Sequence, residues 1–276
     1  ISLLIFGYFK FIGLESKTPK EEKSWYSIEN KKYMERNVFI LTPSDNEPSG
    51  KVILYLHGGA YVGEIENEHW NFVEKLIKDT NNTIILPDYP LAPKYTYKDV
   101  FNMIEPLYKE IVDKVGADNI ILMGDSAGAN LAFAVAIKNK KLKFKEVILA
   151  YPATQTDYTS KTKYKSVIKN SGKTFLTKES LRDYLSLYLR NDKDYKNPYV
   201  NLLKNNWLFG FPKTTIITGT LDPLHDEGIA LKEKLERFLV PVRHLDIDGA
   251  PHAFLTNNIF HQYRDLTIEF LKGSDT

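Results

Sequence analysis

The sequence contains no cysteine, which excludes disulfide bonds, thiol nucleophiles and cysteine-based metal sites. It also lacks an excess of either charge, because 37 basic side chains oppose 35 acidic ones, for a formal net charge of +2. No nucleic-acid partner is therefore expected. Histidines and carboxylates do not follow the spacing of a metal site, so neither a metal nor another cofactor is expected. What is present is an ordinary globular composition, with 43% hydrophobic and 26% charged residues among 276.

Long hydrophobic runs are also missing, with one ambiguous exception at the start of the chain. Residues 1–14 (ISLLIFGYFKFIGL) are apolar but interrupted by Lys10, and this run is too short to span a bilayer. Two interpretations stay open. The run is either an amphipathic helix packed on a cytoplasmic protein, or the end of a membrane anchor or signal segment whose upstream part is missing. The second interpretation predicts a membrane-anchored or extracytoplasmic protein.

Short apolar runs alternate with helical patterns from residue 51 onward. These runs are rich in β-branched residues and predict buried strands at 51–56, 83–89, 119–124, 145–152, 214–220 and 242–247. Helices are predicted at 65–79, 99–115, 127–139, 226–239 and 258–271. Because strands and helices alternate, the sequence predicts an α/β fold, with a mainly parallel central sheet flanked by helices on both faces.

Residues 153–212 break this alternation. They contain no convincing buried strand, but they contain one good helix at 177–190 with a threonine in its N-cap position. A stretch of this length is too large for an idle loop. We therefore expect an insertion that covers one end of the sheet as a helical cap. Residues 1–36 are expected to join the cap, which leaves 37–152 and 213–276 as the main α/β domain.

A serine stands between two glycines in "GDSAG" (124–128), which follows a predicted strand and opens a predicted helix. A strand that turns directly into a helix holds the middle residue in a strained conformation, and the glycines let strand and helix approach closely. The Ser126 hydroxyl then lies near a helix N-terminus, which favours developing negative charge. This context predicts a nucleophile.

A serine nucleophile needs a general base, and that base needs an acid to orient it. On an open parallel sheet both partners come from loops at the carboxyl ends of later strands. "LDPLHDEG" (221–228) follows one such strand and supplies Asp222. "DGAPHAFL" (248–255) follows the next strand and supplies His252. Asp246 and Asp248 are also close to this histidine in the chain and stay open as alternative acids, and Asp248 can also bond locally within the same loop.

"YLHGGAY" (55–61) follows the first strong strand and has the composition of an oxyanion hole. Gly58 and Gly59 allow backbone N–H groups to point at one place with no side chain in the way. The N–H of Ala127, directly after the serine, is the third expected donor. The residues expected to line the neighbouring substrate pocket are Tyr61, Asp125 and Tyr151. His57 is expected to orient the glycine loop, and Asp88 and Asp125 are expected to hold loops through hydrogen bonds.

Five ordered motifs, "HGGAY", "PDYPLAP", "GDSAG", "DPLHDEG" and "GAPHAF", resemble the hormone-sensitive-lipase-like branch of the α/β-hydrolases, the bacterial carboxylesterases. The resemblance covers residues 37–272. It implies the α/β-hydrolase fold, with a helical cap built from the N-terminal segment and an insertion after the sixth strand. The catalytic residues and oxyanion donors that it implies are Ser126, Asp222 and His252, and Gly58, Gly59 and Ala127.

The sequence departs from the family at four positions. Ala60 replaces a frequent third glycine, but backbone donors survive that change and only the pocket beside them becomes tighter. Pro90 and Lys94 stand where the family usually has arginine and glutamate, so an ion pair of the family is expected to be missing. Ala129 replaces a common glycine after the serine.

The function that the resemblance implies is hydrolysis of small-molecule carboxylic esters with short to medium acyl chains, without a cofactor. Two kinds of alternative stay open. The same machinery serves amidases, formamidases and carbohydrate acetyl esterases, because the lining of the cap sets substrate choice. A non-catalytic binding protein of hydrolase fold is the second. The sequence does not fix the oligomeric state, for which a homodimer is one option.

Overall fold

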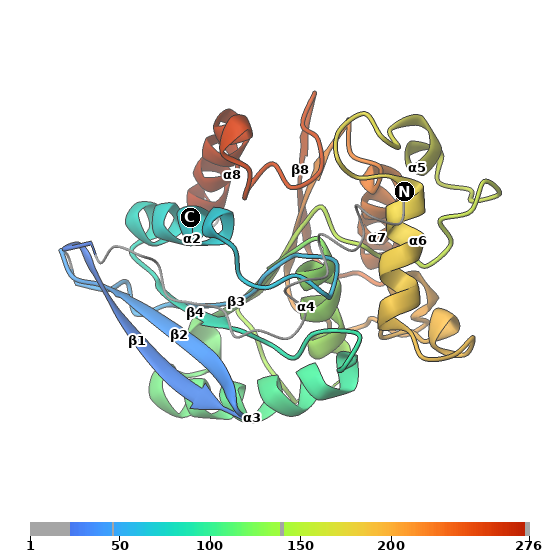
Figure 1. The fold of residues 1–276 in the computed structure, drawn as a ribbon. Helices are drawn as coiled ribbons and strands as arrows, with labels where there is room; N and C mark the ends of the chain where they lie inside the picture. The colour runs from blue at the N-terminus through green and yellow to red at the C-terminus, as the bar shows by residue number, and fades with distance from the viewer. Residues whose placement is uncertain (1–22, 46, 139–140, 274–276) are drawn as a thin grey trace.

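The computed structural model describes residues 23–45, 47–138 and 141–273 (Figure 1). Both interpretations of residues 1–14 therefore lie outside the described part of the chain. Within that part, none of the helices combines the length and the apolar character needed to cross a bilayer. The expected compartment stays a prediction.

Eight strands of the described chain form one sheet. They are β1 (Tyr26–Tyr33), β2 (Arg36–Pro43), β3 (Val52–Leu56), β4 (Thr83–Pro87), β5 (Ile120–Asp125), β6 (Glu146–Ala150), β7 (Thr214–Gly219) and β8 (Val242–Ile247). Their order in the sheet is β1-β2-β4-β3-β5-β6-β7-β8 (Figure 1). Strands β3 to β8 run parallel, and β1 and β2 extend the sheet at one edge through antiparallel pairings. The six predicted strands and the mainly parallel sheet are confirmed.

Helices cover both faces of this sheet, as predicted. The helices are α2 (Asn67–Thr80), α3 (Tyr97–Val115), α4 (Ala127–Lys138), α5 (Lys165–Lys169), α6 (Lys178–Tyr188), α7 (His225–Arg237) and α8 (His261–Lys272). Short 3-10 helices are η2 (Ala117–Asn119), η3 (Asp194–Lys196), η4 (Leu202–Lys204) and η5 (Asn258–Phe260). Figure 1 shows α2 and α8 on one face of the sheet and α3, α4 and α7 on the other.

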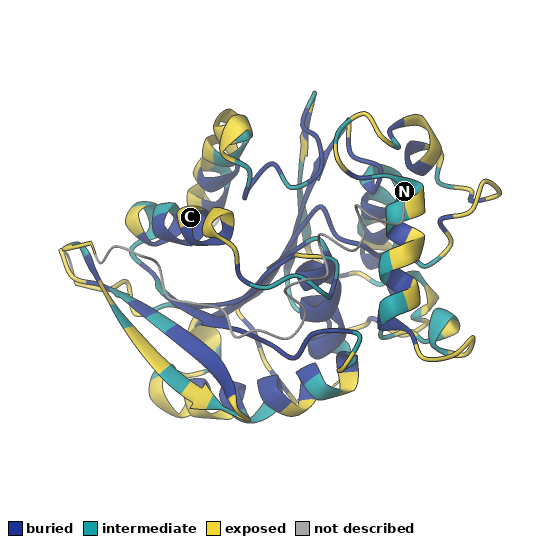
Figure 2. Ribbon diagram, in the orientation of Figure 1, coloured by how far each residue is buried: buried dark blue, intermediate teal, exposed yellow. Residues whose placement is uncertain are grey.

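Alternate side chains of the central strands divide the core between these two helical layers. In β3, Leu54 and Leu56 join the apolar cluster that contains residues of α3, α4 and α7. Ile53 and Tyr55 join the cluster that contains residues of α2 and α8. All five residues of β3 are buried, which is why this strand has a continuous apolar sequence (Figure 2).

Strand β1 lies in a segment that the sequence analysis assigns to the cap. The sequence analysis assigns residues 1–36 to the cap, but residues 26–33 form an edge strand of the sheet, paired with β2 over its whole length. This strand was not predicted because only one of its faces is covered, and it carries charged side chains such as Lys31 and Lys32. Charged residues on an edge strand hinder pairing with another chain, so they suit this place in the sheet.

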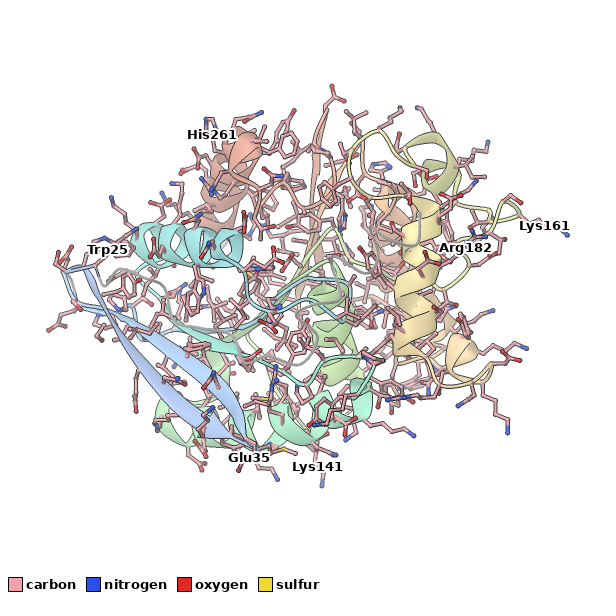
Figure 3. All side chains as sticks on the ribbon, in the orientation of Figure 1. Trp25, Glu35, Lys141, Lys161, Arg182 and His261 are labelled. Atoms are coloured by element: carbon pink, nitrogen blue, oxygen red, sulfur yellow. The ribbon has the colours of Figure 1, made fainter. Side chains whose placement is uncertain are left out.

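Residues 153–212 contain no strand, as the sequence predicts, and the predicted helix is present as α6. The short helix α5 was not predicted. Helix α6 begins after Thr177, whose hydroxyl accepts a hydrogen bond of 3.0 Å from the N–H of Ser180, so the predicted N-cap is confirmed. Charged side chains of this region, such as those of Lys161 and Arg182, lie at the surface (Figure 3). The division of the chain into a main domain and a cap stays a prediction.

Candidate active site

Ser126 lies in the sharp turn between β5 and α4, in a left-handed conformation with φ of 53°. The two glycines around it are required by space. A Cβ atom on Gly124 would lie 2.4 Å from the carbonyl oxygen of Gly128. A Cβ atom on Gly128 would lie 2.0 Å from the carbonyl oxygen of Leu56. The predicted close approach of strand and helix is therefore present, and the strain is concentrated on the serine.

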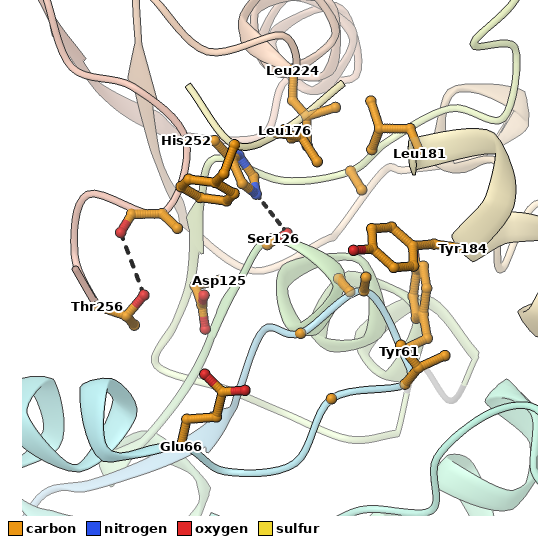
Figure 4. A pocket seen from close by; sticks show the side chains of 18 of the residues that line it. Tyr61, Glu66, Asp125, Ser126, Leu176, Leu181, Tyr184, Leu224, His252 and Thr256 are labelled. Carbon is orange, nitrogen blue, oxygen red and sulfur yellow. Dashed lines mark hydrogen bonds between the residues drawn. The ribbon is translucent and has the colours of Figure 1, made fainter. Parts of the chain in front are cut away.

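The structure brings the three predicted catalytic side chains into one hydrogen-bonded chain. The Ser126 Oγ lies 2.9 Å from His252 Nε2 (Figure 4), and His252 Nδ1 lies 2.7 Å from Asp222 Oδ2. Asp222 is fully buried and His252 is almost so. A carboxylate at Nδ1 holds the proton on that nitrogen, which leaves Nε2 free to accept the serine proton.

The loop after β7 fixes the carboxylate of Asp222. Its Oδ1 accepts a hydrogen bond of 2.8 Å from the N–H of Leu224. The Asn170 amide, which comes from the end of α5, donates to the carbonyl oxygens of Thr220 and Asp222, both at 3.0 Å. One of the alternative acids, Asp248, instead accepts a hydrogen bond from Thr220 and so holds the neighbouring loop.

The structure contradicts the prediction that Gly58 is an oxyanion donor. Its N–H already donates to Asp125 Oδ1 at 2.7 Å, so it is not free to donate to a substrate oxygen. The backbone of Gly59, Ala60 and Ala127 lines the pocket instead. Within the described residues, the N–H groups of these three have no hydrogen-bond acceptor. They are therefore free to donate to an oxygen of a bound substrate.

The loop that carries these donors is strained. Ala60 and Tyr61 have φ of 54° and 67°, a left-handed conformation that costs a non-glycine residue about 1–3 kcal/mol. Hydrogen bonds hold it in place. The carbonyl oxygen of Gly59 accepts from Gly63 N at 2.7 Å, and that of Tyr61 accepts from Ala92 N at 2.9 Å.

His57 and Asp125 hold the loop of Gly58 and Gly59 in place, as predicted for both. The His57 ring stacks on Tyr89 with centroids 4.3 Å apart, and its Nδ1 lies 2.7 Å from the carbonyl oxygen of Gly58. Burial lowers the pKa of His57 well below its usual value, so its ring is neutral. Asp125 Oδ1 also accepts from the hydroxyl of Tyr55 at 2.6 Å.

A cavity of about 330 Å³ opens above Ser126, and Figure 4 shows its walls. One wall is apolar and comes mainly from residues 153–212, which are called the inserted segment below. It consists of Ala153, Tyr158, Phe175, Leu176, Leu181, Tyr184, Leu185 and Leu224. The opposite wall is polar and contains Glu64, Glu66, Glu68, His69, Thr256 and Asn257. Among the described residues that line the cavity, none is a lysine or an arginine.

Two of the three predicted pocket residues lie where expected. Tyr61 and Asp125 line the cavity, but Tyr151 does not. Tyr151 lies behind the imidazole of His252, with ring centroids 5.0 Å apart, and its hydroxyl lies 3.5 Å from Asp125 Oδ2. Its position after β6 turns the ring into the core, where burial raises the pKa of its hydroxyl.

Sequence reasoning missed the structural importance of Glu227, which lies in the first turn of α7. Its buried carboxyl group accepts hydrogen bonds from Thr154 N at 2.6 Å, Gln155 Nε2 at 2.9 Å and the Tyr158 hydroxyl at 3.2 Å. Burial raises the pKa of Glu227 to about 8. This group joins the first residues of the inserted segment to the helix that follows Asp222. The sequence gave no sign that this glutamate is buried, because carboxylates are common in the first turns of helices.

A buried ion pair is present near "PDYPLAP", although Pro90 and Lys94 depart from the family. The Arg36 guanidinium donates to Asp88 Oδ1 and to the carbonyl oxygen of Asp88, both at 2.8 Å. Asp88 therefore holds a loop, as predicted. Its partner, Arg36, lies in the edge hairpin that the sequence patterns did not predict.

The comparisons agree with this architecture, in which a parallel sheet presents a serine, a histidine and an aspartate at the carboxyl ends of its strands. A family model described as the alpha/beta hydrolase fold matches residues 53–256. An arylesterase from Saccharolobus solfataricus is 30% identical over 227 residues, which cover 78% of this chain and 72% of that protein. An acetyl esterase from Salmonella paratyphi A is 29% identical over 237 residues, covering 82% and 70%.

Solved structures give the same result for the fold. An esterase from Pyrobaculum calidifontis superposes with a TM-score of 0.79 over 92% of this chain and 87% of that chain, at 23% identity. An arylesterase structure superposes with a TM-score of 0.76 over 92% and 84%, at 26% identity. The chain belongs to the α/β-hydrolase fold family, and the predicted resemblance to its carboxylesterases is confirmed.

Proposed function

We propose that this protein hydrolyses carboxylic esters with short to medium acyl chains, with Ser126 as nucleophile, His252 as base and Asp222 as the orienting acid. The observation that carries the proposal is the hydrogen-bonded chain from the serine Oγ through the imidazole to the buried carboxylate. The arylesterase and acetyl esterase relatives support esters as the substrate class.

The first half of the reaction acylates the serine. Ser126 Oγ attacks the ester carbonyl carbon while His252 Nε2 accepts the hydroxyl proton. The carbonyl oxygen becomes an oxyanion, which the N–H groups of Gly59, Ala60 and Ala127 stabilise. When the tetrahedral intermediate collapses, the bond to the alcohol oxygen breaks, and the imidazolium gives its proton to that oxygen.

The second half releases the acid and repeats the same proton transfers with water. His252 Nε2 takes a proton from water as the water oxygen attacks the acyl carbon. Collapse of the second intermediate breaks the bond to Ser126 Oγ, which recovers its proton from the imidazolium. Asp222 keeps the imidazole in one tautomer and stabilises its charge in both halves. These steps need no group from outside the chain except water and the ester.

The cavity supports short to medium acyl chains. Its volume of about 330 Å³ is at the lower end of ligand pockets, and leucines such as Leu181 and Leu185 close it on the apolar side. A chain of that size fits against an aliphatic wall. A palmitoyl chain would need to leave the cavity, and its extra methylenes would gain little binding energy from burial.

The test is hydrolysis of p-nitrophenyl esters from acetate to palmitate. We expect turnover by the wild type with a maximum below long chains, and loss of at least about 10⁴-fold in kcat for Ser126→Ala and Asp222→Asn. Ser186→Ala, which changes an exposed serine on α6, is the matched control and should keep wild-type activity.

Other outcomes of this assay distinguish the alternatives. Turnover of anilides or acetylated sugars in place of simple esters would favour an amidase or a carbohydrate acetyl esterase. A folded wild type that hydrolyses none of these substrates, and that a fluorophosphonate does not label at Ser126, would contradict the proposal and favour a binding protein. Near-normal turnover by Asp222→Asn would contradict the assignment of Asp222 as the acid, but not the proposed reaction.

A further inference from the structure

Helix α6 contacts the strained glycine loop through one pair of stacked rings. Tyr188 is the last residue of α6, and its ring lies parallel to that of Tyr61, with centroids 3.9 Å apart and planes 3° from parallel. Both side chains are buried. Figure 4 shows Tyr61 on the side of the cavity where α6 carries Tyr184. The stack therefore joins the inserted segment to the loop that holds the proposed oxyanion donors.

The contact falls on the residue that directly follows a proposed donor. Ala60 supplies one N–H to the cavity, and Tyr61 follows it directly, with both in left-handed conformations. Two consecutive non-glycine residues keep such a conformation only when their surroundings enforce it. The Tyr61 carbonyl is fixed by Ala92, and its side chain is fixed by the ring of Tyr188.

The carboxyl end of α6 is itself attached to the main domain next to this loop. The Arg190 guanidinium donates hydrogen bonds to the carbonyl oxygens of Pro93 and Lys94, the latter at 3.0 Å. These residues directly follow Ala92, which donates to the Tyr61 carbonyl. The end of α6, the segment after Asp88 and the glycine loop thus hold one another in place.

The ring of Tyr188, and not its hydroxyl, makes the contact. The hydroxyl is buried without a hydrogen-bond partner among the described residues. Tyr188 does not line the cavity, so a substrate bound there would not touch it. Tyr61 is the residue of the glycine loop on which the Tyr188 ring stacks, whereas its contact with Tyr97, with centroids 6.5 Å apart, lies outside that loop.

We propose that Tyr188 is a positioning residue, which holds the N–H of Ala60 in its donating orientation through the stack with Tyr61. The inserted segment then does more than line the pocket, because the oxyanion hole is complete only while the end of α6 is docked. The expected change in kcat rests on the proposed esterase function, whereas the expected change in the mobility of the glycine loop does not.

The experiment compares Tyr188→Leu, which removes the stack, with Tyr188→Phe, which keeps it. For Tyr188→Leu we expect kcat to fall about 10- to 100-fold with KM changed less than about threefold, because losing a full donor costs about 10²–10³ in kcat. A trifluoromethyl ketone, whose hemiketal adduct with Ser126 Oγ places an oxyanion in the hole, should lose affinity by the same factor as kcat/KM. Tyr188→Phe should restore both values to within about twofold of wild type.

Hydrogen exchange of the amides in residues 57–63 supplies a readout that needs no substrate. Exchange should become faster in Tyr188→Leu and stay unchanged in Tyr188→Phe. Equal exchange in both variants overturns the proposal, as does a loss in Tyr188→Leu that appears in KM alone. If the wild type hydrolyses no ester but exchange still responds to the stack, the proposed function fails while the positioning stands. If Tyr188→Leu does not fold, Tyr188→Met replaces it, with the same expected results.

Discussion

The buried carboxyl group of Glu227 shows how one side chain can join two parts of the chain and respond to pH. Its pKa of about 8 in the folded protein, against 4.5 as an ordinary glutamate, means that the folded protein holds this proton where the unfolded chain has lost it. Stability from this group is therefore fully present below about pH 4.5 and is lost as the pH rises toward 8.

The variant Glu227→Gln removes this titration while keeping the size of the side chain. The stability of the variant relative to wild type should rise between about pH 4.5 and 8, by roughly 1–4 kcal/mol in total. Thermal and urea unfolding at a series of pH values measures this difference. The exposed Glu233→Gln on the same helix is the control and should give a flat difference. A flat result for both variants would mean that Glu227 is ionised in the fold.

Individual residues of the candidate site also show which features could be predicted from the sequence and which could not. Ser126, Asp222 and His252 were predictable because their loops follow parallel strands, whose ends must meet at one edge. The donors were not fully predictable. Which N–H of the glycine loop faces the cavity is decided by Asp125, which captures the N–H of Gly58 from a strand far along the chain.

Among the elements, the hairpin of β1 and β2 is the part that the sequence patterns miss. The six parallel strands are buried on both faces, so each has an apolar run that is easy to recognise. The hairpin lies at the edge, and its turn carries Met34 and Glu35 with φ of 47° and 61°. Turns of this kind usually carry Asn-Gly, so the usual signal was absent.

The same mismatch predicts a stabilising change. Replacing Met34 by Asn and Glu35 by Gly should stabilise the protein by about 0.5–1 kcal/mol, because both residues then tolerate positive φ. Chemical unfolding measures the gain, and esterase activity should not change, since the turn is far from the cavity in the chain and does not line it. Glu35→Ala, which shortens the side chain without relieving the backbone, should not stabilise. A gain of equal size in that control would refute the explanation.

For the whole molecule, the central helix α4 joins the sheet to the inserted segment. The side-chain amide of Asn130 donates hydrogen bonds to the carbonyl oxygens of Ala153 at 2.7 Å and Val200 at 2.8 Å. These two residues stand near the beginning and the end of the insertion, so one buried side chain, only 1% exposed, holds both of its ends. The helix that begins directly after Ser126 therefore also holds residues of the 153–212 segment.

Asn130→Asp should be strongly destabilising. The carboxylate cannot donate, so two buried carbonyl groups lose their partner and a charge is buried without compensation, at a cost of roughly 3–5 kcal/mol. Urea unfolding followed by far-UV circular dichroism measures the loss. Asn102→Asp, an exposed change on α3, is the control and should stay within about 0.5 kcal/mol of wild type. Equal stability of the two variants would show that the amide does not hold the insertion.

The position of the base on the chain has a consequence for biosynthesis. Ser126 follows β5, whereas His252 follows β8, which lies at the far edge of the sheet beside β7. A ribosome therefore makes the proposed nucleophile long before it makes the proposed base that would activate it. A nascent chain that stops short of the last strand carries a serine with no proton acceptor, so it remains chemically silent. Hydrolytic power arises in a single late event, when the final strand takes its place.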